Sequence, residues 1–300
     1  MEKVLLIWNP SSGRPRWNRR RRLLEAFARH GVQVELREFD HGRLAEWIEE
    51  AKQKGFQSIV AAGGDGTVNA VATEASRADL PMGVIPLGTF NHFAKDLRIP
   101  LDLQDAVDSL FEGQLVHVDM GEVNGRRFLN NSSIGLYPLL VKIREQERKL
   151  RKAGKLFATL EAFWKVLVRF RLRRVRIKSG NVSIVSRTPF VFVGNNFYDL
   201  TLMHFGRRRT LNQGKLTLYL ARCRTRRSVL RLAMRIVSNG LSQDRDFQSL
   251  EVEEVEVLTR RERLMVSLDG EVEILTSPLR YKSVPAALPV LLPKSSPLAD

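Results

Sequence analysis

Three short segments of this 300-residue chain combine glycine with small polar side chains, a composition that suits phosphate binding. They span residues 9–13, 63–69 and 86–91, and each follows a run of apolar residues typical of a strand. Glycine lets the backbone adopt positive φ and approach a ligand closely. Backbone amides in such loops, and at the start of a following helix, can bind phosphate oxygens. The pattern predicts a phosphate-binding site built from three loops.

Asp65 is the one acidic residue in these loops. A carboxylate among phosphate-binding amides would repel the ligand unless a Mg²⁺ ion or a substrate hydroxyl lies between them. The alternative is that residues 63–67 form only a tight strand-to-helix turn in which Asp65 caps the helix. Because two further loops of similar composition are expected beside it, the sequence favours the ligand site.

Alternating strands and helices position these loops in the first part of the chain. Such alternation predicts a mostly parallel sheet with right-handed crossovers, and all three loops should emerge at the carboxyl edge, where ligands bind. The predicted strands cover residues 4–8, 32–39, 58–62 and 82–86, and the predicted helices cover about 17–30, 43–54 and 68–75.

Strand-like segments dominate after about residue 115, which predicts an antiparallel second domain, a sandwich or partly closed barrel. The fold class is therefore α/β plus β, with a nucleotide-binding domain at 1–116 and a β-rich domain at 117–286. The tail, about 287–300, could return to the first domain. The strands are expected at 115–123, 126–132, 172–178, 182–186, 190–193, 215–221, 249–258, 264–268 and 272–275, with helical inserts at about 139–170 and 228–241.

Two common nucleotide-binding motifs are missing from the sequence. It contains neither a strand-linked G-x-G-x-x-G nor a G-x-x-x-x-G-K-[ST] segment. This argues against a Rossmann dehydrogenase and against a P-loop NTPase.

Residues 9–13, 63–69 and 87–94 together resemble the catalytic domain of diacylglycerol kinases, and above all the soluble bacterial lipid kinases of that family. Sphingosine and ceramide kinases are related. The resemblance continues through 119–121, 194–195 and 268–271. The motif at 63–67 is shared with NAD kinases and 6-phosphofructokinases, so the neighbouring Gly88-Thr89-x-Asn91 is what indicates a lipid kinase.

The resemblance implies an ATP- and Mg²⁺-dependent kinase that phosphorylates a lipid hydroxyl. Asp65 would lie at the catalytic centre with a Mg²⁺. Glu271 would be the general base on the lipid hydroxyl, with Asp269 beside it, and Asp119 would join a polar network at the domain junction as a candidate metal-site residue. The nucleotide would be held by Asn9, Ser11, Ser12, Gly13, Gly63, Gly64, Gly66, Thr67, Asn69, Gly88, Thr89 and Asn91.

Two features of the second domain qualify this assignment. Asp269-Gly270 also reads as a hairpin turn between two strands, because this dipeptide favours type I′ turns. Relatives commonly place an acidic residue before the glycine matching Gly214, where it helps bind a structural Mg²⁺. Asn212 and Gln213 stand there instead, and neutral amides are weaker ligands for a hard cation. That metal site is therefore in doubt.

The charge balance predicts an anionic partner. The chain has 49 Lys+Arg against 33 Asp+Glu, a net charge of +16. Residues 142–178 contain 14 Lys+Arg and 3 acids. The same segment has an apolar stripe, which either contacts an anionic membrane surface or packs on the second domain. Nucleic acid is not expected, since no recognition helix, zinc site or base-stacking motif accompanies the charges. The stripe consists of Leu156, Leu160, Phe163, Leu167 and Phe170.

The sequence says less about where in the cell the protein acts and about which molecule accepts the phosphoryl group. The single cysteine, Cys223, the lack of a signal-peptide pattern and the lack of an apolar run of about 20 residues favour a cytoplasmic protein at the membrane periphery. The sequence does not decide whether the protein forms a homodimer, which lipid it phosphorylates, or whether it uses ATP or GTP. The alternative functions are an NAD kinase-like enzyme with a soluble acceptor and a non-catalytic nucleotide- or lipid-binding module.

Overall fold

The structure is a computed structural model. It describes residues 2–13, 18–136, 138, 172–199, 207–208, 210–223, 225, 227–229, 231–232 and 246–296. The chain divides into two compact units, which are described separately. Unit 1 comprises Met1–Met120, Arg207–Gly214 and Val284–Asp300, and unit 2 comprises Gly121–Gly206 and Lys215–Ser283.

Unit 1 is built on parallel strands in the order β2-β1-β3-β4. The end of β18 (Leu279–Leu292) extends this sheet, because Val290 pairs in parallel with Met82 of β4. Strands β1, β3 and β4 are almost wholly apolar and buried, as expected where both faces of a sheet are covered, whereas the edge strand β2 is largely polar and only partly buried. Their bounds are β1 Lys3–Trp8, β2 Gln33–Glu38, β3 Ser58–Gly63 and β4 Met82–Pro86.

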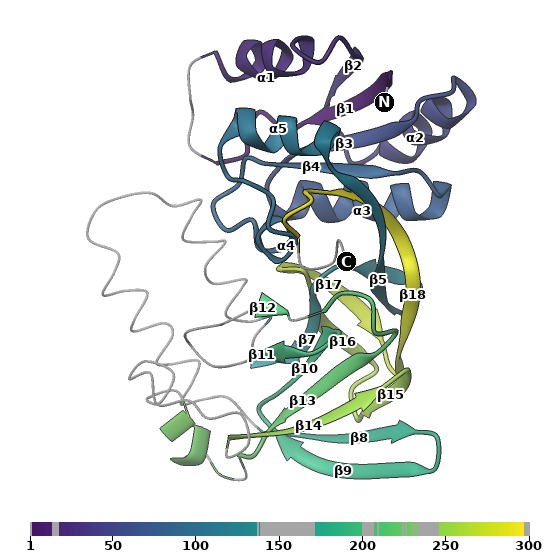
Figure 1. The fold of residues 1–300 in the computed structure, drawn as a ribbon. Helices are drawn as coiled ribbons and strands as arrows, with labels where there is room; N and C mark the ends of the chain where they lie inside the picture. Colours follow the sequence, from purple (N-terminus) through teal and green to yellow (C-terminus); the bar gives the residue numbers. More distant parts are fainter. Residues whose placement is uncertain are drawn as a thin grey trace. The chain divides into compact units, whose positions relative to one another are not determined.

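Helices cover both faces of this sheet. Figure 1 shows α1 and α5 on one face and α2 and α3 on the other, and each pair is in contact. Asp102 caps α5 by accepting the amide of Gln104 at 2.8 Å. The helices are α1 Arg19–Ala28, α2 Leu44–Gln53, α3 Asp65–Ala78, α4 His92–Asp96 and α5 Leu103–Glu112. The predicted α/β domain is therefore confirmed.

Helix α3 begins earlier than predicted. Gly64 is its N-cap, with extended backbone at φ −92° and ψ −177°, and the helix starts at Asp65 rather than near Val68. Asp65, Gly66 and Thr67 thus form the first helical turn and not a loop. Asp65 is not the N-cap of this helix either, which corrects the alternative interpretation of the turn.

Unit 2 contains a six-stranded antiparallel sheet in the order β14-β13-β10-β7-β16-β17. These strands are β7 Asn131–Gly135, β10 Phe190–Asn195, β13 Leu216–Ala221, β14 Phe247–Val252, β16 Arg263–Leu268 and β17 Glu271–Thr276.

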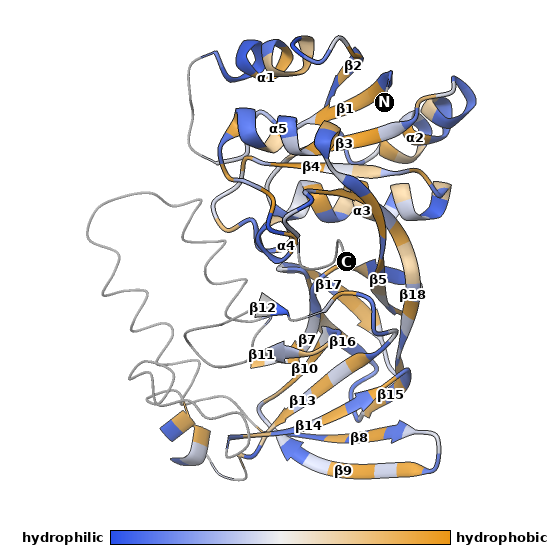
Figure 2. Ribbon diagram, in the orientation of Figure 1, coloured by the Kyte–Doolittle hydropathy of each residue, from blue (hydrophilic) through white to orange (hydrophobic). Residues whose placement is uncertain are grey.

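The first residues of β18 join a second antiparallel array in unit 2, in the order β18-β15-β8-β9. The core between the two sheets contains residues of both, such as Val193 and Leu218 from one and Ile177 and Tyr281 from the other. Figure 2 shows the strands carrying most of the hydrophobic residues. This confirms the predicted sandwich. The remaining strands are β5 Gln114–Val123, β6 Arg126–Phe128, β8 Arg173–Ser179, β9 Val182–Thr188, β11 Tyr198–Asp199, β12 Arg207–Arg208 and β15 Glu254–Thr259.

Two predicted strands are each divided in the structure. Residues 126–132 split into β6 and β7, and residues 249–258 split into β14 and β15. In both cases the halves belong to different sheets, because the chain crosses from one layer of the sandwich to the other. The amides of Leu129 and Asn130 at the first crossing bind the Asp269 carboxylate, and the carbonyl of Glu253 at the second accepts the amide of Ser283.

The basic apolar stripe predicted within residues 142–178 lies mostly outside the described residues, as do most of the two helical inserts. Across the described ranges, no helix is long and apolar enough to span a bilayer.

Candidate active site

The three predicted loops begin at one edge of the unit 1 sheet. Trp8 pairs with Ala62 and Gly63 pairs with Pro86, so the strands end at matching levels. Inside the first loop, Asn9 Oδ1 accepts the amide of Ser11 at 3.0 Å and the Asn9 carbonyl accepts that of Ser12 at 3.2 Å. These bonds fold residues 9–12 into a compact turn at the end of β1.

Side chains join the first loop to the start of α3. Ser12 Oγ accepts the amide of Gly64 at 3.0 Å, and Asn9 Nδ2 donates to Thr67 Oγ1 at 2.8 Å. Thr67 is buried. Asn9, Ser12 and Thr67 therefore fix the geometry of the loops themselves.

Asp65 joins α3 to the third loop. Its Oδ2 accepts the amide of Asn91 at 3.0 Å and its Oδ1 accepts that of His92 at 2.7 Å. These amides open helix α4, so Asp65 caps a helix other than its own. Asn91 holds the loop from within, accepting the amide of Gly88 at 2.9 Å and donating to the Gly88 carbonyl at 3.1 Å.

Glycine is required where the loops touch. Gly13 has φ +70°, and a Cβ there would lie 2.2 Å from the Leu87 carbonyl oxygen. A Cβ on Gly88 would lie 2.6 Å from the Cα of Gly64. The loops pack backbone against backbone, which confirms that they meet at one place.

Several groups at this edge are suited to an anion and its cation. No side chain caps α3, so its first amides are available to phosphate oxygens. The Asn69 side-chain oxygen is buried without a hydrogen-bond partner. Each Asp65 oxygen has a second lone pair beyond the one that accepts an amide. Thr89 is exposed beside these groups.

In unit 2, Asp269 and Gly270 form the two-residue turn between β16 and β17, with φ of 47° and 89°. Positive φ at both positions is the geometry of a type I′ hairpin, so the predicted turn is confirmed. Asp269 Oδ2 accepts the amide of Leu129 at 2.7 Å, and Oδ1 accepts those of Asn130 and Asn131 at 2.8 Å each. Its carboxylate thus anchors the crossing between the two sheets.

Glu271 follows the turn as the first residue of β17, paired with Leu268, and its side chain is exposed. Asp269 and Glu271 therefore differ in environment, although two positions separate them. The carboxylate of Asp269 is held by three backbone amides, whereas Glu271 lies exposed at the start of β17.

Asp119 lies in unit 1 and is buried. Its Oδ2 accepts the amide of Gly214 at 2.6 Å and its Oδ1 accepts that of Ala286 at 2.9 Å. The carboxylate thus ties together three distant segments of unit 1. Asn212 and Gln213 add no carboxylate, and no three metal-binding side chains cluster within the described residues. The residues present do not fit the structural Mg²⁺ site of relatives.

A buried ion pair beside α4 has no signature in the sequence. Arg208 Nε lies 2.8 Å from Asp96 Oδ2, and both side chains are buried. Burial raises the pKa of the Asp96 carboxyl, and the Arg208 guanidinium opposes that shift. The guanidinium also lies 5.9 Å from the Phe93 ring centroid. This pair attaches residues 207–208 to the helix that Asp65 caps.

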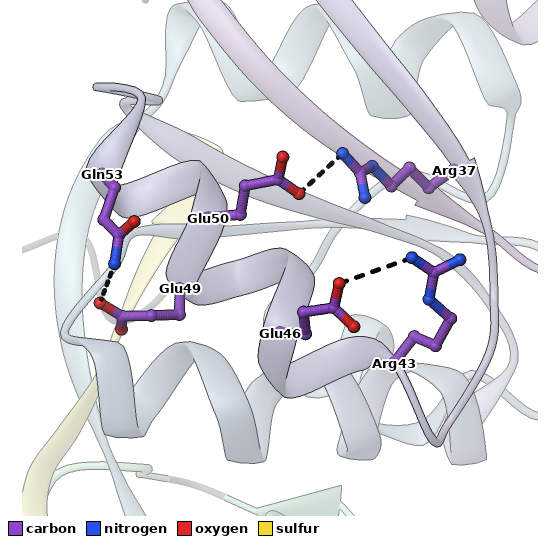
Figure 3. A pocket seen from close by; sticks show the side chains of 6 residues that line it. All are labelled: Arg37, Arg43, Glu46, Glu49, Glu50 and Gln53. Atoms are coloured by element: carbon purple, nitrogen blue, oxygen red, sulfur yellow. Dashed lines mark hydrogen bonds and ion pairs between the residues drawn. The ribbon is translucent and has the colours of Figure 1, made fainter.

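A pocket of about 450 Å³ lies on α2 and β2 (Figure 3). Its charged side chains bind one another: Arg37 pairs with Glu50 at 2.9 Å and Arg43 with Glu46 at 3.5 Å. None of its lining residues belongs to the three loops. We assign no ligand to it.

Comparison with known proteins identifies the domain. Residues 3–123 match the family described as diacylglycerol kinase catalytic domain. Proteins described as "Probable lipid kinase YegS-like" from Yersinia pestis (strain Pestoides F) and Yersinia pseudotuberculosis (serotype O:1b, strain IP 31758) are each 34% identical over 143 residues. That match covers 45% of this chain and 47% of each relative, so it spans about half the length of these curated proteins.

Solved structures extend the similarity to the whole fold. A structure described as a diacylglycerol kinase from Bacillus anthracis strain Sterne has a TM-score of 0.71 at 18% identity, covering 98% of both chains. A second structure from the same organism reaches 0.76 at 19% identity, again over 98% of both chains. Residues 3–123 thus match the diacylglycerol kinase catalytic domain, and the solved structures show that the chain shares their fold.

Proposed function

We propose that this protein is a lipid kinase that transfers the γ-phosphoryl group of ATP to a lipid hydroxyl. The proposal rests on one observation. Hydrogen bonds of Ser12, Asp65 and Asn91 join the three loops beside the N-terminus of α3, which no side chain caps. Phosphoryl transfer depends mainly on positioning and on stabilising negative charge, and such a junction suits both.

The nucleotide phosphates would bind the amides of residues 65–67 and the loops around Gly13 and Gly88. Asn69 would direct its unpartnered side-chain oxygen to a bound water or hydroxyl. Mg²⁺, when bound, would neutralise phosphate charge beside Asp65, whose oxygens keep lone pairs for its hydration shell. Asp65 would then have two functions, since the same carboxylate orients α4.

Glu271 would act as general base. It would accept the proton of the lipid hydroxyl while the hydroxyl oxygen bonds to the γ-phosphorus and the bond to the leaving ADP oxygen breaks. Asp269 suits this task less, because three backbone amides already occupy its carboxylate. We assign Asp269 a positioning role: it fixes the turn that presents Glu271.

The test is an acceptor panel. The protein is incubated with Mg²⁺ and γ-³²P-labelled ATP or GTP, together with diacylglycerol, sphingosine, ceramide, a glycerophospholipid or NAD. Label in one lipid supports the proposal. Label in NAD would indicate an NAD kinase-like enzyme, and label in neither, with nucleotide still bound, would indicate a non-catalytic module.

Replacing Gly13 by alanine is expected to weaken ATP binding by about tenfold or more. The Cβ would displace the Leu87 carbonyl, while the positive φ would cost about 1–2 kcal/mol in addition. Gly55 provides the control, because it also has φ +70° but a Cβ there meets nothing within 4 Å. Calorimetric titration with ATP should separate Gly13→Ala from Gly55→Ala. Equal affinities would show that the first loop does not contact the nucleotide.

An anionic membrane surface is the partner we propose for unit 2. Arg174, Arg176 and Lys178 on β8 are exposed along one face, and Arg174 lies opposite the exposed Arg187 of β9. Within the described part of the chain, none of the four forms an ion pair. Like charges placed opposite one another destabilise a strand pair unless an anion compensates.

Changing Arg174 and Arg176 to glutamine should weaken binding to phosphatidylserine-containing vesicles. Each basic residue near such a surface contributes about 1 kcal/mol, so the loss should be roughly 30-fold. The control changes Arg20 and Arg22 of α1 to glutamine, which alters net charge equally. Vesicle co-sedimentation at several salt concentrations measures both. Equal losses would attribute binding to overall charge instead of to β8.

A further inference from the structure

Helix α4 is too short to be stable by itself. It contains 5 residues, and isolated helices shorter than about 12 residues are marginal in water. Backbone bonds close its last turn, since Leu97 donates to the Phe93 carbonyl at 3.1 Å and Ile99 donates to the Ala94 carbonyl at 2.9 Å. The position of α4 in unit 1 therefore depends on the side chains that contact its two ends.

The first end of α4 is held by Asp65. The two oxygens of this carboxylate accept the amides of Asn91, at 3.0 Å, and His92, at 2.7 Å. Because each oxygen accepts one amide, the plane of the carboxylate follows the position of α4. A displacement of the helix would turn the carboxylate away from the phosphate and Mg²⁺ site proposed beside it.

The other end of α4 carries Asp96, a carboxylate in an unfavourable place. The C-terminus of a helix has partial negative charge, which disfavours an acidic side chain there. The Asp96 side chain is also only 3% exposed, so it has lost most of its hydration. Arg208 compensates for both effects. Its Nε lies 2.8 Å from Asp96 Oδ2, and its side chain is 0% exposed.

Arg208 contacts α4 at two positions. Besides pairing with Asp96, its guanidinium lies 5.9 Å from the ring centroid of Phe93. Residues three apart in a helix lie on the same side of it, so one planar group contacts neighbouring side chains. Together the two contacts restrain both the position of α4 and its rotation about its own axis.

The segment that carries Arg208 is itself anchored in unit 1. Three residues further on, the Leu211 carbonyl accepts the amide of Asp119 at 2.7 Å, and the Gly214 amide donates to Asp119 Oδ2 at 2.6 Å. Leu211 and Asp119 are both buried. The Arg208 side chain therefore extends from a backbone that Asp119 holds in place.

Stability alone does not account for a buried ion pair at this position. Such a pair is often no more stable than apolar side chains of similar volume, because removing two charges from water offsets their attraction. The pair does supply orientation, since hydrogen bonds between charged groups are short and directional. Orientation matters beside a reacting group, where a misplacement of about 1 Å can lower a rate about 10²-fold.

We propose that Asp96 and Arg208 are positioning residues, which hold the Asp65 carboxylate in the orientation needed for phosphoryl transfer. They act through α4, which lies between the ion pair and Asp65, and take no part in the chemical step. The proposal rests on the proposed kinase function and adds two residues to its machinery. Asp119 supports the arrangement by anchoring the segment that carries Arg208.

The test compares two double variants, each of which neutralises one arginine–carboxylate pair of unit 1. Asp96→Asn/Arg208→Met leaves no buried charge unpaired, so the fold should be retained. The control is Glu50→Gln/Arg37→Met. Arg37 has similar partners, since its guanidinium lies 2.9 Å from Glu50 Oε2 and 5.3 Å from the ring centroid of Trp47. This control pair lies on α2 and β2, outside the three loops.

The first readout does not depend on catalysis. Hydrogen exchange of the Asn91 and His92 amides is followed by NMR without nucleotide. Protection of both amides should fall on the order of tenfold in the Asp96/Arg208 variant, because α4 no longer holds them against Asp65. The second readout is kcat, which should fall about 10- to 100-fold with little change in the KM for ATP. The control should match wild type in both readouts.

Wild-type protection of these amides in the Asp96/Arg208 variant would overturn the proposal, and so would wild-type kcat. An equal loss in the control would also overturn it, by attributing the effect to general destabilisation. Lost protection in a protein without kinase activity would support the link from Arg208 to Asp65 and reject the kinase. Arg208→Lys replaces the double variant if that protein does not fold. Lysine keeps the charge but lacks the planar fork, so unchanged protection in this variant would likewise contradict the proposal.

Discussion

Asp65→Asn is expected to lower kcat for phosphoryl transfer on the order of 10³-fold. The substitution removes the negative charge beside the proposed Mg²⁺ and phosphate site. It also leaves one side-chain oxygen where two now accept the amides of Asn91 and His92. One of those amides would then face an NH₂ group, so α4 and the third loop would lose their fixed position. Asp65→Ala, which removes both acceptors, should abolish transfer.

Steady-state kinetics of folded Asp65→Asn, verified by circular dichroism, tests this expectation. Asp79→Asn is the matched control, since Asp79 is exposed at the other end of α3 and its αL backbone accommodates asparagine. The control should retain wild-type kcat. If Asp65→Asn did the same, the carboxylate would serve only as a cap for α4.

Glu271→Gln is expected to lower kcat by roughly 10²–10⁴-fold and to leave the KM for ATP unchanged. Glutamine has nearly the same shape and can still form the β17 pairing with Leu268, but it cannot accept a proton from the lipid hydroxyl. The defect should therefore be confined to the chemical step. Rapid-quench measurement of the first turnover should report it directly.

Glu273 provides the control on the same strand. Its carboxylate lies 3.4 Å from Arg126 Nε, and Glu273→Gln should leave kcat unchanged. Turnover retained by Glu271→Gln would remove this residue from the mechanism. Loss in Asp269→Asn together with a lower melting temperature would fit the anchoring role we assign to Asp269.

Local patterns were sufficient to predict the fold and the three loops. Each loop follows a short apolar run, and parallel strands place their carboxyl ends at one edge, so residues 9–13, 63–69 and 86–91 had to meet. The Asp269-Gly270 turn was likewise predictable from the sequence, because this dipeptide favours the two positive φ values of a type I′ turn. These features depend on neighbours in sequence.

Features that depend on distant partners could not be predicted. Asp65 caps a helix 26 residues away, and Arg208 pairs with Asp96 across 112 residues. The division of residues 126–132 into two strands depends on Asp269, about 140 residues further on. No local pattern in the sequence indicates these particular pairings.

The most direct measurement is ³¹P NMR of the lipid extracted after the protein has reacted with ATP, Mg²⁺ and short-chain diacylglycerol. A lipid phosphomonoester resonance that grows as ADP forms, and is missing with Asp65→Asn and Glu271→Gln, is the predicted result. ATP consumed with only inorganic phosphate released, or the same lipid product from both variants, would contradict the account.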